Sequence, residues 1–134
     1  MADPVTHVIE GARRIAVVGA SDDQEKASNE VMRTLLDAGF EVVPVNPTVD
    51  EVHGVPAVAS LADIEGPIDI VDVFRRAEHA PDIAEEAVAV GAGTVWLQQG
   101  ITSPEARRIA QDGGVGFVED LCLGATVRQA GLAS

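Results

Sequence analysis

The sequence predicts an α/β fold built on a doubly wound parallel sheet. Five short apolar runs alternate with segments in which apolar residues recur every three to four positions, which is the spacing of a helix. The runs are mostly continuous rather than alternately apolar and polar, as in strands of a sheet that is covered on both faces. Because crossovers between parallel strands are right-handed, this order winds helices onto both faces of the sheet. No repeat or linker divides the chain, so we expect one domain over residues 1–134.

In the first half of the chain, two strands flank one helix. Ser28 has the hydroxyl side chain of a helix N-cap, and the apolar spacing after it predicts a helix with one buried face. Asn46-Pro47 ends the second strand. The expected elements are a lead-in over residues 1–12 with a helical turn around Val5–Glu10, a strand over Arg14–Val18, a helix from Ser28 to about Gly39, and a strand over Phe40–Val45.

The second half repeats the alternation three times. Pro81 suits the first turn of a helix, and Thr102 followed three residues later by Glu105 is a helix-opening pattern. Before these elements, Val52–Ala59 is expected to hold a short strand near Pro56–Val58. The other expected elements are strands over Ile68–Phe74, Thr94–Leu97 and Val115–Val118, helices from Pro81 to Gly91 and from Thr102 to about Asp112, and a short helix within Leu121–Leu132.

Composition narrows the class of protein. The 134 residues are 46% hydrophobic, which is typical of a globular chain with a sizeable core. No apolar stretch approaches the roughly 20 residues that span a membrane, and the first residues do not resemble a signal peptide. A single cysteine, Cys122, excludes an internal disulfide and suits a reducing compartment. We therefore expect a cytoplasmic protein.

The charge of the chain excludes two kinds of partner. The net charge is −13, from 22 acidic and 9 basic residues, and such a surface repels nucleic acids and anionic membranes. Lys26 is the only lysine. The acidic, lysine-poor composition is typical of a proteome adapted to a salt-rich cytoplasm, and a GC-rich genome is an equally good explanation.

The strongest functional signal is the turn after the first strand. In Arg14-Ile15-Ala16-Val17-Val18-Gly19-Ala20-Ser21, an apolar strand stops at Gly19-Ala20-Ser21 and a helix follows within a few residues. A Rossmann-like turn of this kind directs backbone N–H groups and a positive helix end at an anion. Ligands of doubly wound sheets bind at the carboxyl ends of the strands, so this turn predicts a nucleotide or a nucleotide-containing cofactor.

A nicotinamide cofactor is disfavoured by two observations. Its binding turn has the pattern G-x-G-x-x-G, whereas the loop here, residues 19–24, contains one glycine. A dinucleotide site has an acidic residue or an arginine after the second strand, and this chain has Asn46-Pro47. An oxidoreductase that uses NAD or NADP therefore stays an alternative.

Four motifs occur in a shared order: Val17-Val18-Gly19-Ala20-Ser21, Val45-Asn46-Pro47, Val71-Asp72-Val73-Phe74-Arg75 and Trp96-Leu97-Gln98-Gln99-Gly100-Ile101. With them the chain resembles the small stand-alone CoA-binding-domain proteins, whose domain is similar to the CoA-binding domain of the succinyl-CoA synthetase α subunit. The resemblance extends from about residue 10 to residue 132. It implies that the chain binds coenzyme A or an acyl-CoA.

The resemblance also implies a set of ligand-binding residues. Backbone N–H groups of Gly19, Ala20 and Ser21 would hold a CoA phosphate, and the Asn46-Pro47 corner would border the nucleotide. Phe74 and Arg75 would line the same cleft. The remaining implied positions are Lys26, which would approach the phosphates, Ser28 at the start of the first helix, and Gly100, which would close the pocket along the pantetheine arm. The charges of Lys26 and Arg75 suit the phosphates of CoA independently of the resemblance.

The chain departs from its relatives at three points. Synthetase α subunits carry a phosphorylated histidine in a second domain, which has no counterpart here. Leu121 stands where stand-alone relatives often have an arginine before the cysteine, and Lys26 stands where an arginine is common. Lysine keeps the charge but loses the bidentate geometry.

No residue is assigned a catalytic role. No nucleophile–base pair is visible, no histidines and carboxylates share the spacing of metal ligands, and Cys122 between two leucines is typical of an inert buried thiol. Asp72, inside an apolar strand, is expected to be a satisfied buried carboxylate or a contact near the site. We thus expect a CoA-binding protein without catalysis of its own. A regulatory module with a vestigial pocket remains an alternative, and a homo-oligomer is possible under either.

Overall fold

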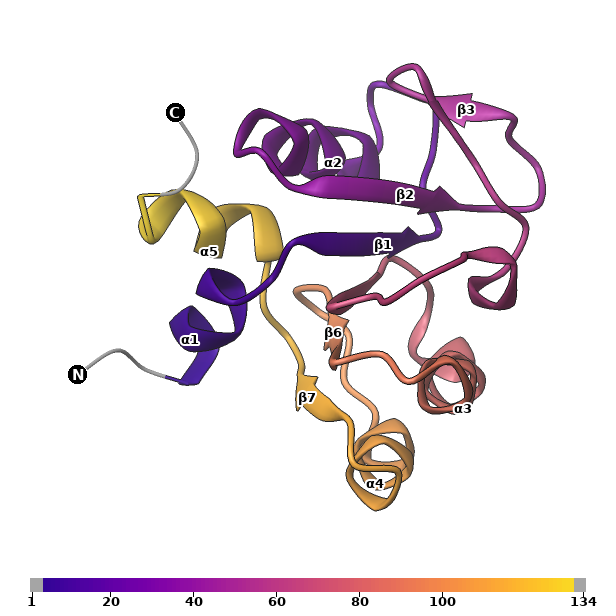
Figure 1. Cartoon of the computed structure of the whole chain (residues 1–134), viewed down its shortest axis with the longest axis vertical. Coiled ribbons are helices and arrows are strands. Elements are labelled where there is room, and N and C mark those ends of the chain that lie inside the picture. Colours follow the sequence, from indigo (N-terminus) through magenta and orange to yellow (C-terminus); the bar gives the residue numbers. More distant parts are fainter. Residues whose placement is uncertain (1–3, 132–134) are drawn as a thin grey trace.

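Five parallel strands form the central sheet of the computed structural model, which describes residues 4–131. The strands lie in the order β2-β1-β5-β6-β7 (Figure 1). All four neighbouring pairs are parallel, with Ile15 beside Val42 on one side and beside Ile70 on the other. The strand bounds are β1 Arg14–Val18, β2 Glu41–Val45, β5 Ile70–Val73, β6 Thr94–Leu97 and β7 Gly116–Val118. The predicted fold class is confirmed.

Helices cover both faces of the sheet. The helices are α1 Pro4–Glu10, α2 Ala27–Asp37, α3 Ala80–Val90, α4 Pro104–Asp112 and α5 Leu123–Gln129. In Figure 1, α3 and α4 lie on one side of the sheet, while α1, α2 and α5 lie on the other. Alternate residues of one strand therefore enter different cores, as Ile70 and Val71 do.

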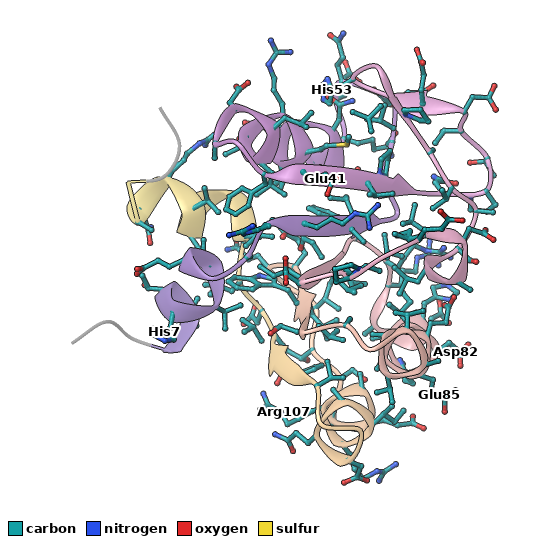
Figure 2. All side chains as sticks on the ribbon, viewed as in Figure 1. His7, Glu41, His53, Asp82, Glu85 and Arg107 are labelled. Carbon is teal, nitrogen blue, oxygen red and sulfur yellow. The ribbon has the colours of Figure 1, made fainter. Side chains whose placement is uncertain are left out.

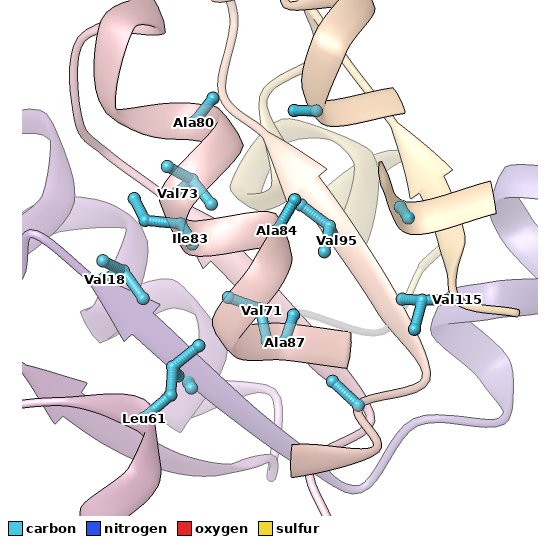
Figure 3. Packing of buried hydrophobic residues seen from close by; sticks show 14 of the residues in the cluster. Val18, Leu61, Val71, Val73, Ala80, Ile83, Ala84, Ala87, Val95 and Val115 are labelled. Carbon is cyan, nitrogen blue, oxygen red and sulfur yellow. The ribbon is translucent and has the colours of Figure 1, made fainter. Parts of the chain in front are cut away.

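The two cores are built differently. Under α3, valines of the sheet meet small alanines, which lets the helix approach closely; Figure 3 shows Val71 and Val95 beside Ala84 and Ala87. On the other face, bulky side chains such as Trp96, Met32 and Leu35 are completely buried. Trp96 is oriented by a 2.8 Å hydrogen bond from its Nε1 to the Leu121 carbonyl.

The connection between β2 and β5 contains a pair of strands that the sequence does not predict. It forms a small antiparallel hairpin of β3 Glu51–Val52 and β4 Val55–Pro56, followed by the 3-10 turn η1 Leu61–Asp63. The expected strand near Pro56–Val58 is partly right, because Val58 forms an isolated parallel bridge with Val45. A second 3-10 turn, η2 Ala77–His79, leads into α3.

Two predicted helix caps are wrong by one or two residues. The N-cap of α2 is Lys26, because its carbonyl accepts from the amides of Asn29 and Glu30, and Ser28 lies buried in the first turn. The N-cap of α4 is Ser103 rather than Thr102, and its Oγ accepts a hydrogen bond from the Ala106 amide.

Candidate functional site

The order of the strands predicts where a ligand would bind. From β1 the chain winds outward to β2 and then returns to place β5 on the other side of β1. The crossover through α2 covers one face, and the chain leaving β5 enters α3 on the opposite face. The carboxyl ends of β1 and β5 therefore border a crevice at the switch point of the sheet. Gly19 and Phe74 are the residues that follow these two strands.

Gly19 allows β1 and β5 to come this close at their ends. Its φ is +87°, and a Cβ at this position would lie 2.6 Å from the Phe74 carbonyl oxygen and 3.1 Å from Cδ of Arg75. Its own N–H donates to the Val45 carbonyl at 3.0 Å, so this amide is already used within the sheet. Only glycine fits here, and the N–H groups left to bind a ligand belong to later residues of the turn.

The loop from Ser21 to Lys26 is ordered by short side-chain bonds to its own backbone. Ser21 Oγ accepts from the Asp23 amide at 3.0 Å, and Asp23 Oδ1 accepts from the Glu25 amide at 2.9 Å. The Lys26 amide then donates to the Asp23 carbonyl at 3.0 Å. These bonds place the start of α2 beside the end of β1.

A pocket of about 360 Å³ lies at this helix start. It is lined by Gly19, Ser21, Lys26, Ala27, Ser28 and Phe74. Within residues 4–131, no hydrogen-bond acceptor faces the amides of Ala27 and Ser28, which belong to the first turn of the helix. Five of the ten residues that the sequence predicted for the site thus share one pocket.

The side chain of Asn46 stabilises the turn that follows β1. Its Nδ2 donates to the Ala20 carbonyl at 2.8 Å, and its Oδ1 accepts from both the amide and the hydroxyl of Thr48. Both ends of the side-chain amide are thus used inside the chain. Asn46 ties the end of β2 to the turn after β1, and Ala20 itself is buried in the core.

A second pocket, of about 220 Å³, lies on the other side of the crevice. It contains the predicted residues Pro47 and Arg75, together with His79, Asp82 and Glu86. Figure 2 shows Asp82 on α3. Burial, and to a smaller extent the negative charge of Asp82, raises the pKa of Glu86. These three residues were not predicted from the sequence, although positions 79, 82 and 86 share the spacing of one helical face.

Two cations at this edge have no ion-pair partner within the described chain. Lys26 borders the first pocket and Arg75 the second. Arg76, the next residue, lies 3.9 Å from Glu78. Arg75 and Arg76 are both exposed, so they differ in pairing and position rather than in burial.

Gly100 lies apart from the other predicted residues. It follows the end of β6, has a φ of +88° and lines neither pocket. Its amide donates to Asp120 Oδ1 at 2.7 Å, which ties the ends of β6 and β7 together.

A larger hollow of about 600 Å³ lies at the opposite edge of the sheet, between α1 and the start of β2. Glu10, Glu41 and Arg13 line it, so acidic side chains outnumber the basic one and make it less suited to a phosphate than the carboxyl edge. Ligands of such sheets bind at the carboxyl edge, so the size of this hollow does not make it the site.

Two other findings concern residues 4–131 as a whole. This part of the chain contains no group of histidine, cysteine and acidic side chains that could hold a metal ion. It also contains no helix long and apolar enough to cross a membrane.

Comparison with known proteins identifies the family. Residues 13–128 match the model of the CoA binding domain. The uncharacterized protein YneT of Bacillus subtilis is 45% identical over 119 residues, which cover 89% of this chain and 88% of YneT. The solved structure of a hypothetical protein from Pyrococcus horikoshii is similar with a TM-score of 0.91 and 32% identity, over 94% of this chain and 89% of that one.

One similar protein has a known activity in its name. The α subunit of the ADP-forming acetate–CoA ligase II of Pyrococcus furiosus is 32% identical over 123 residues, which cover 84% of this chain but 27% of the subunit. The likeness thus concerns one domain of a larger enzyme subunit. With the family model matched along most of its length, the chain belongs to the CoA-binding domain family.

Proposed function

We propose that this chain binds coenzyme A or an acyl-CoA at the carboxyl edge of β1 and β5, and that binding is its activity. The observation that carries this proposal is the match to the CoA binding domain over residues 13–128. The geometry of the edge supports it, because a turn, a helix start and two cations without an ion-pair partner among residues 4–131 meet there. That the protein is cytoplasmic and forms a homo-oligomer stays a prediction.

The first pocket has the chemistry of a phosphate site. The amides of Ala27 and Ser28 lack acceptors within residues 4–131, and the positive end of the α2 dipole lies beside them. Lys26 adds a full charge next to them. We infer that the pyrophosphate of CoA lies here, near Ser21. Gly19 would serve by allowing the close approach, and Ala20 and Asn46 by holding the turn in shape.

Arg75 connects the two pockets. Its side chain passes close to Gly19, as the 3.1 Å separation between its Cδ and a Cβ built on Gly19 indicates, and it lines the second pocket with Pro47. A guanidinium in this place would bind a phosphate group of the nucleotide. Phe74 would offer its apolar side chain to the ligand between the two pockets. Gly100 has no direct part in this arrangement.

Ligand-dependent melting tests the proposal. A ligand that binds only the folded state stabilises it by about 2.7 kcal/mol at a concentration of 100 Kd. We expect CoA and acetyl-CoA to raise the Tm, and NAD and NADP to leave it unchanged. Acetyl-CoA is included because a related subunit belongs to an acetate–CoA ligase. A rise with NAD or NADP alone would favour the oxidoreductase alternative, and no rise with any of the four would favour the vestigial pocket.

Arg75→Ala compared with Arg76→Ala tests the site itself. Loss of a charge-assisted contact to phosphate should weaken CoA binding by about 1–3 kcal/mol. Isothermal titration calorimetry would measure a Kd about 5- to 150-fold higher for Arg75→Ala. Arg76→Ala removes the same charge from the next residue and should keep the affinity nearly unchanged, because that side chain lies beside Glu78. Equal effects of both variants would indicate a general loss of charge rather than a contact.

A further inference from the structure

A further cavity, of about 250 Å³, lies between α2 and α5 and shares one lining residue with the first pocket. Ala27 lines both cavities, so the start of α2 is shared between them. Gln98 and Cys122 are among the residues that line it, and Glu30 and Arg128 contribute the charged side chains. Arg128 is held by a 2.9 Å hydrogen bond from its Nη2 to Thr34 Oγ1.

Gln98 brings an unused hydrogen-bonding group to this cavity. It follows β6 directly, and its amide donates to the Val73 carbonyl at 3.3 Å, which places it beside Phe74. The residue is 9% exposed, and its Oε1 has no hydrogen-bond partner among the described residues. The oxygen is itself inaccessible to solvent, so a donor from a ligand reaches it only after the Gln98 side chain turns toward the cavity; a buried carbonyl without a donor destabilises the fold and favours that turn.

Cys122 supplies a thiol to the same cavity. It is the only cysteine of the chain and is half-buried. Its backbone is fixed on both sides: the Cys122 carbonyl accepts from the hydroxyl of Thr126 at 2.8 Å, and the Leu121 carbonyl accepts from Trp96 at 2.8 Å. The thiol is thus presented on a rigid support rather than on a mobile loop.

The two cavities are arranged to hold one elongated ligand. A phosphate at the start of α2 would lie at the end of β1, and Gln98 lies at the end of β6, two strand spacings or about 10 Å away across the edge. The arm of CoA carries two amide groups and ends in a thiol. Its N–H groups are the donors that Gln98 Oε1 lacks, and its sulfur would then approach Cys122.

We propose that this cavity receives the thiol end of the ligand, and that Cys122 exchanges with a disulfide of that thiol to hold CoA as a mixed disulfide. This inference rests on the proposed function. The Cys122 thiolate attacks one sulfur of a CoA disulfide, which forms a bond between Cys122 Sγ and that sulfur. The original sulfur–sulfur bond breaks, and the second CoA leaves as a thiolate that takes up a proton. The cysteine is oxidised and half of the disulfide is reduced, so no other oxidant is needed.

Intact mass spectrometry of the full chain tests this exchange. The reduced protein is mixed with CoA disulfide and, separately, with glutathione disulfide at the same concentration, and the adduct is followed over time. Binding holds the CoA disulfide next to the thiol, so we expect its reaction to be faster by about tenfold or more. The product should carry one CoA for each chain, should be absent from Cys122→Ser, and should be reversed by a reducing agent.

Variants of two glutamines separate recognition from plain reactivity. Gln98→Ala should slow the reaction with CoA disulfide by about threefold or more and leave the reaction with glutathione disulfide unchanged. Gln111→Ala, on the exposed side of α4, should change neither rate. Circular dichroism of each variant shows whether it has folded.

Two results would overturn the inference. Equal rates with the two disulfides would show an exposed thiol without a site for the ligand. Absence of an adduct would do the same, provided that calorimetry on the reduced wild-type protein detects CoA binding, in which case the proposed function survives. If reduced wild-type protein does not bind CoA, the proposed function fails first, and the inference fails with it.

Discussion

Asp72 is an acidic residue whose side chain lies in the protein core, away from the water that would hydrate its charge. It lies in the middle of β5 beside Val17 and Trp96, and it is completely buried. Neither carboxylate oxygen has a hydrogen-bond partner in the described chain. Burial raises the pKa of Asp72 well above its ordinary value of 3.8, because the charged form loses its hydration. The folded protein therefore keeps this carboxyl protonated under conditions in which the unfolded chain ionises it.

The raised pKa predicts how Asp72→Asn changes stability with pH. Below pH 3.8 the carboxyl is protonated in both states, so it adds no pH dependence. As the pH rises above that value, unfolding releases a proton, and the wild-type protein loses stability by up to about 1.4 kcal/mol per pH unit until the folded pKa is reached. Asparagine does not titrate. We expect the variant to gain stability relative to wild type as the pH increases, as measured by urea unfolding between pH 5 and pH 8.

A matched variant controls for the general effect of removing one negative charge. Asp112→Asn removes one negative charge from an exposed position at the end of α4. Its stability relative to wild type should change little over the same pH range. If Asp72→Asn behaves in the same way, Asp72 is ionised in the folded protein and must have a partner.

The sequence allowed a partial prediction at the residue scale. A glycine after an apolar strand predicted the turn at Gly19. Asp72 was expected to be a satisfied buried carboxylate or a contact near the site, and the expected hydrogen-bond partner is absent from the described residues. The missing partner of Asp72 and the contact of Gly19 with the Phe74 carbonyl depend on which strands are neighbours. The pairing of β1 with β5 joins residues more than fifty positions apart, and no local pattern encodes it.

At the element scale, the start of α4 is fixed by residues from β7 and its flank. The Ser103 amide donates to Glu119 Oε1 at 3.0 Å, and Arg107 forms an ion pair with Glu119 at 2.5 Å. Arg107, labelled in Figure 2, also lies 5.1 Å from the ring centre of Phe117. The hydrogen bond from Arg107 lowers the pKa of Glu119. Glu119 therefore stabilises this junction above the ordinary pKa of a glutamate, and its contribution is lost as the pH falls through the lowered value.

These contacts explain why the helix cap was predicted one residue too early. Thr102 with Glu105 has the pattern of a capping box, and local sequence cannot tell it from Ser103. Glu119, sixteen residues further on, binds the Ser103 amide and so decides the choice. For α2, the Lys26 carbonyl accepts the first backbone bonds of the helix, so the helix begins ahead of Ser28 although Lys26 has no capping side chain.

Alanine substitutions at the two hydroxyl residues separate the true cap from the predicted one. Ser103 Oγ accepts from the Ala106 amide at 3.1 Å, and removal of such a cap costs about 1 kcal/mol. We expect Ser103→Ala to lower the free energy of unfolding in urea by that amount. Thr102→Ala, at an exposed position, should lower it by less than about 0.5 kcal/mol. A larger loss at Thr102 would contradict the cap assignment.

At the scale of the whole molecule, the sequence predicted the architecture better than the site. Alternation of apolar runs and helical segments is a property of the entire chain, and it was enough to predict a parallel sheet with two covered faces. The predicted site residues follow strands that end at one edge, so most of them lie together. Their division between two pockets depends on the faces that α2 and α3 cover, which side-chain packing decides.

The net charge of −13 gives the binding of CoA an unusual dependence on salt. The charge of the whole molecule repels a polyanion over a Debye length of about 30 Å at 0.01 M salt, and of only about 8 Å at 0.15 M. The contacts of Lys26 and Arg75 with phosphate would be short-range, so salt weakens them much less over this range. We therefore expect CoA to bind more tightly at 0.15 M salt than at 0.01 M, as measured by calorimetry.

The remote charges that cause this effect can be changed without altering the site. Glu85 on α3 and Asp112 on α4 are exposed and line neither pocket at the carboxyl edge. Glu85→Gln combined with Asp112→Asn removes two negative charges and should raise the affinity at 0.01 M salt, with a smaller effect at 0.15 M, because screening already acts there. Affinity that falls steadily with salt in both proteins would mean that direct contacts with phosphate outweigh the net charge, as in proteins that neutralise nucleic-acid phosphates.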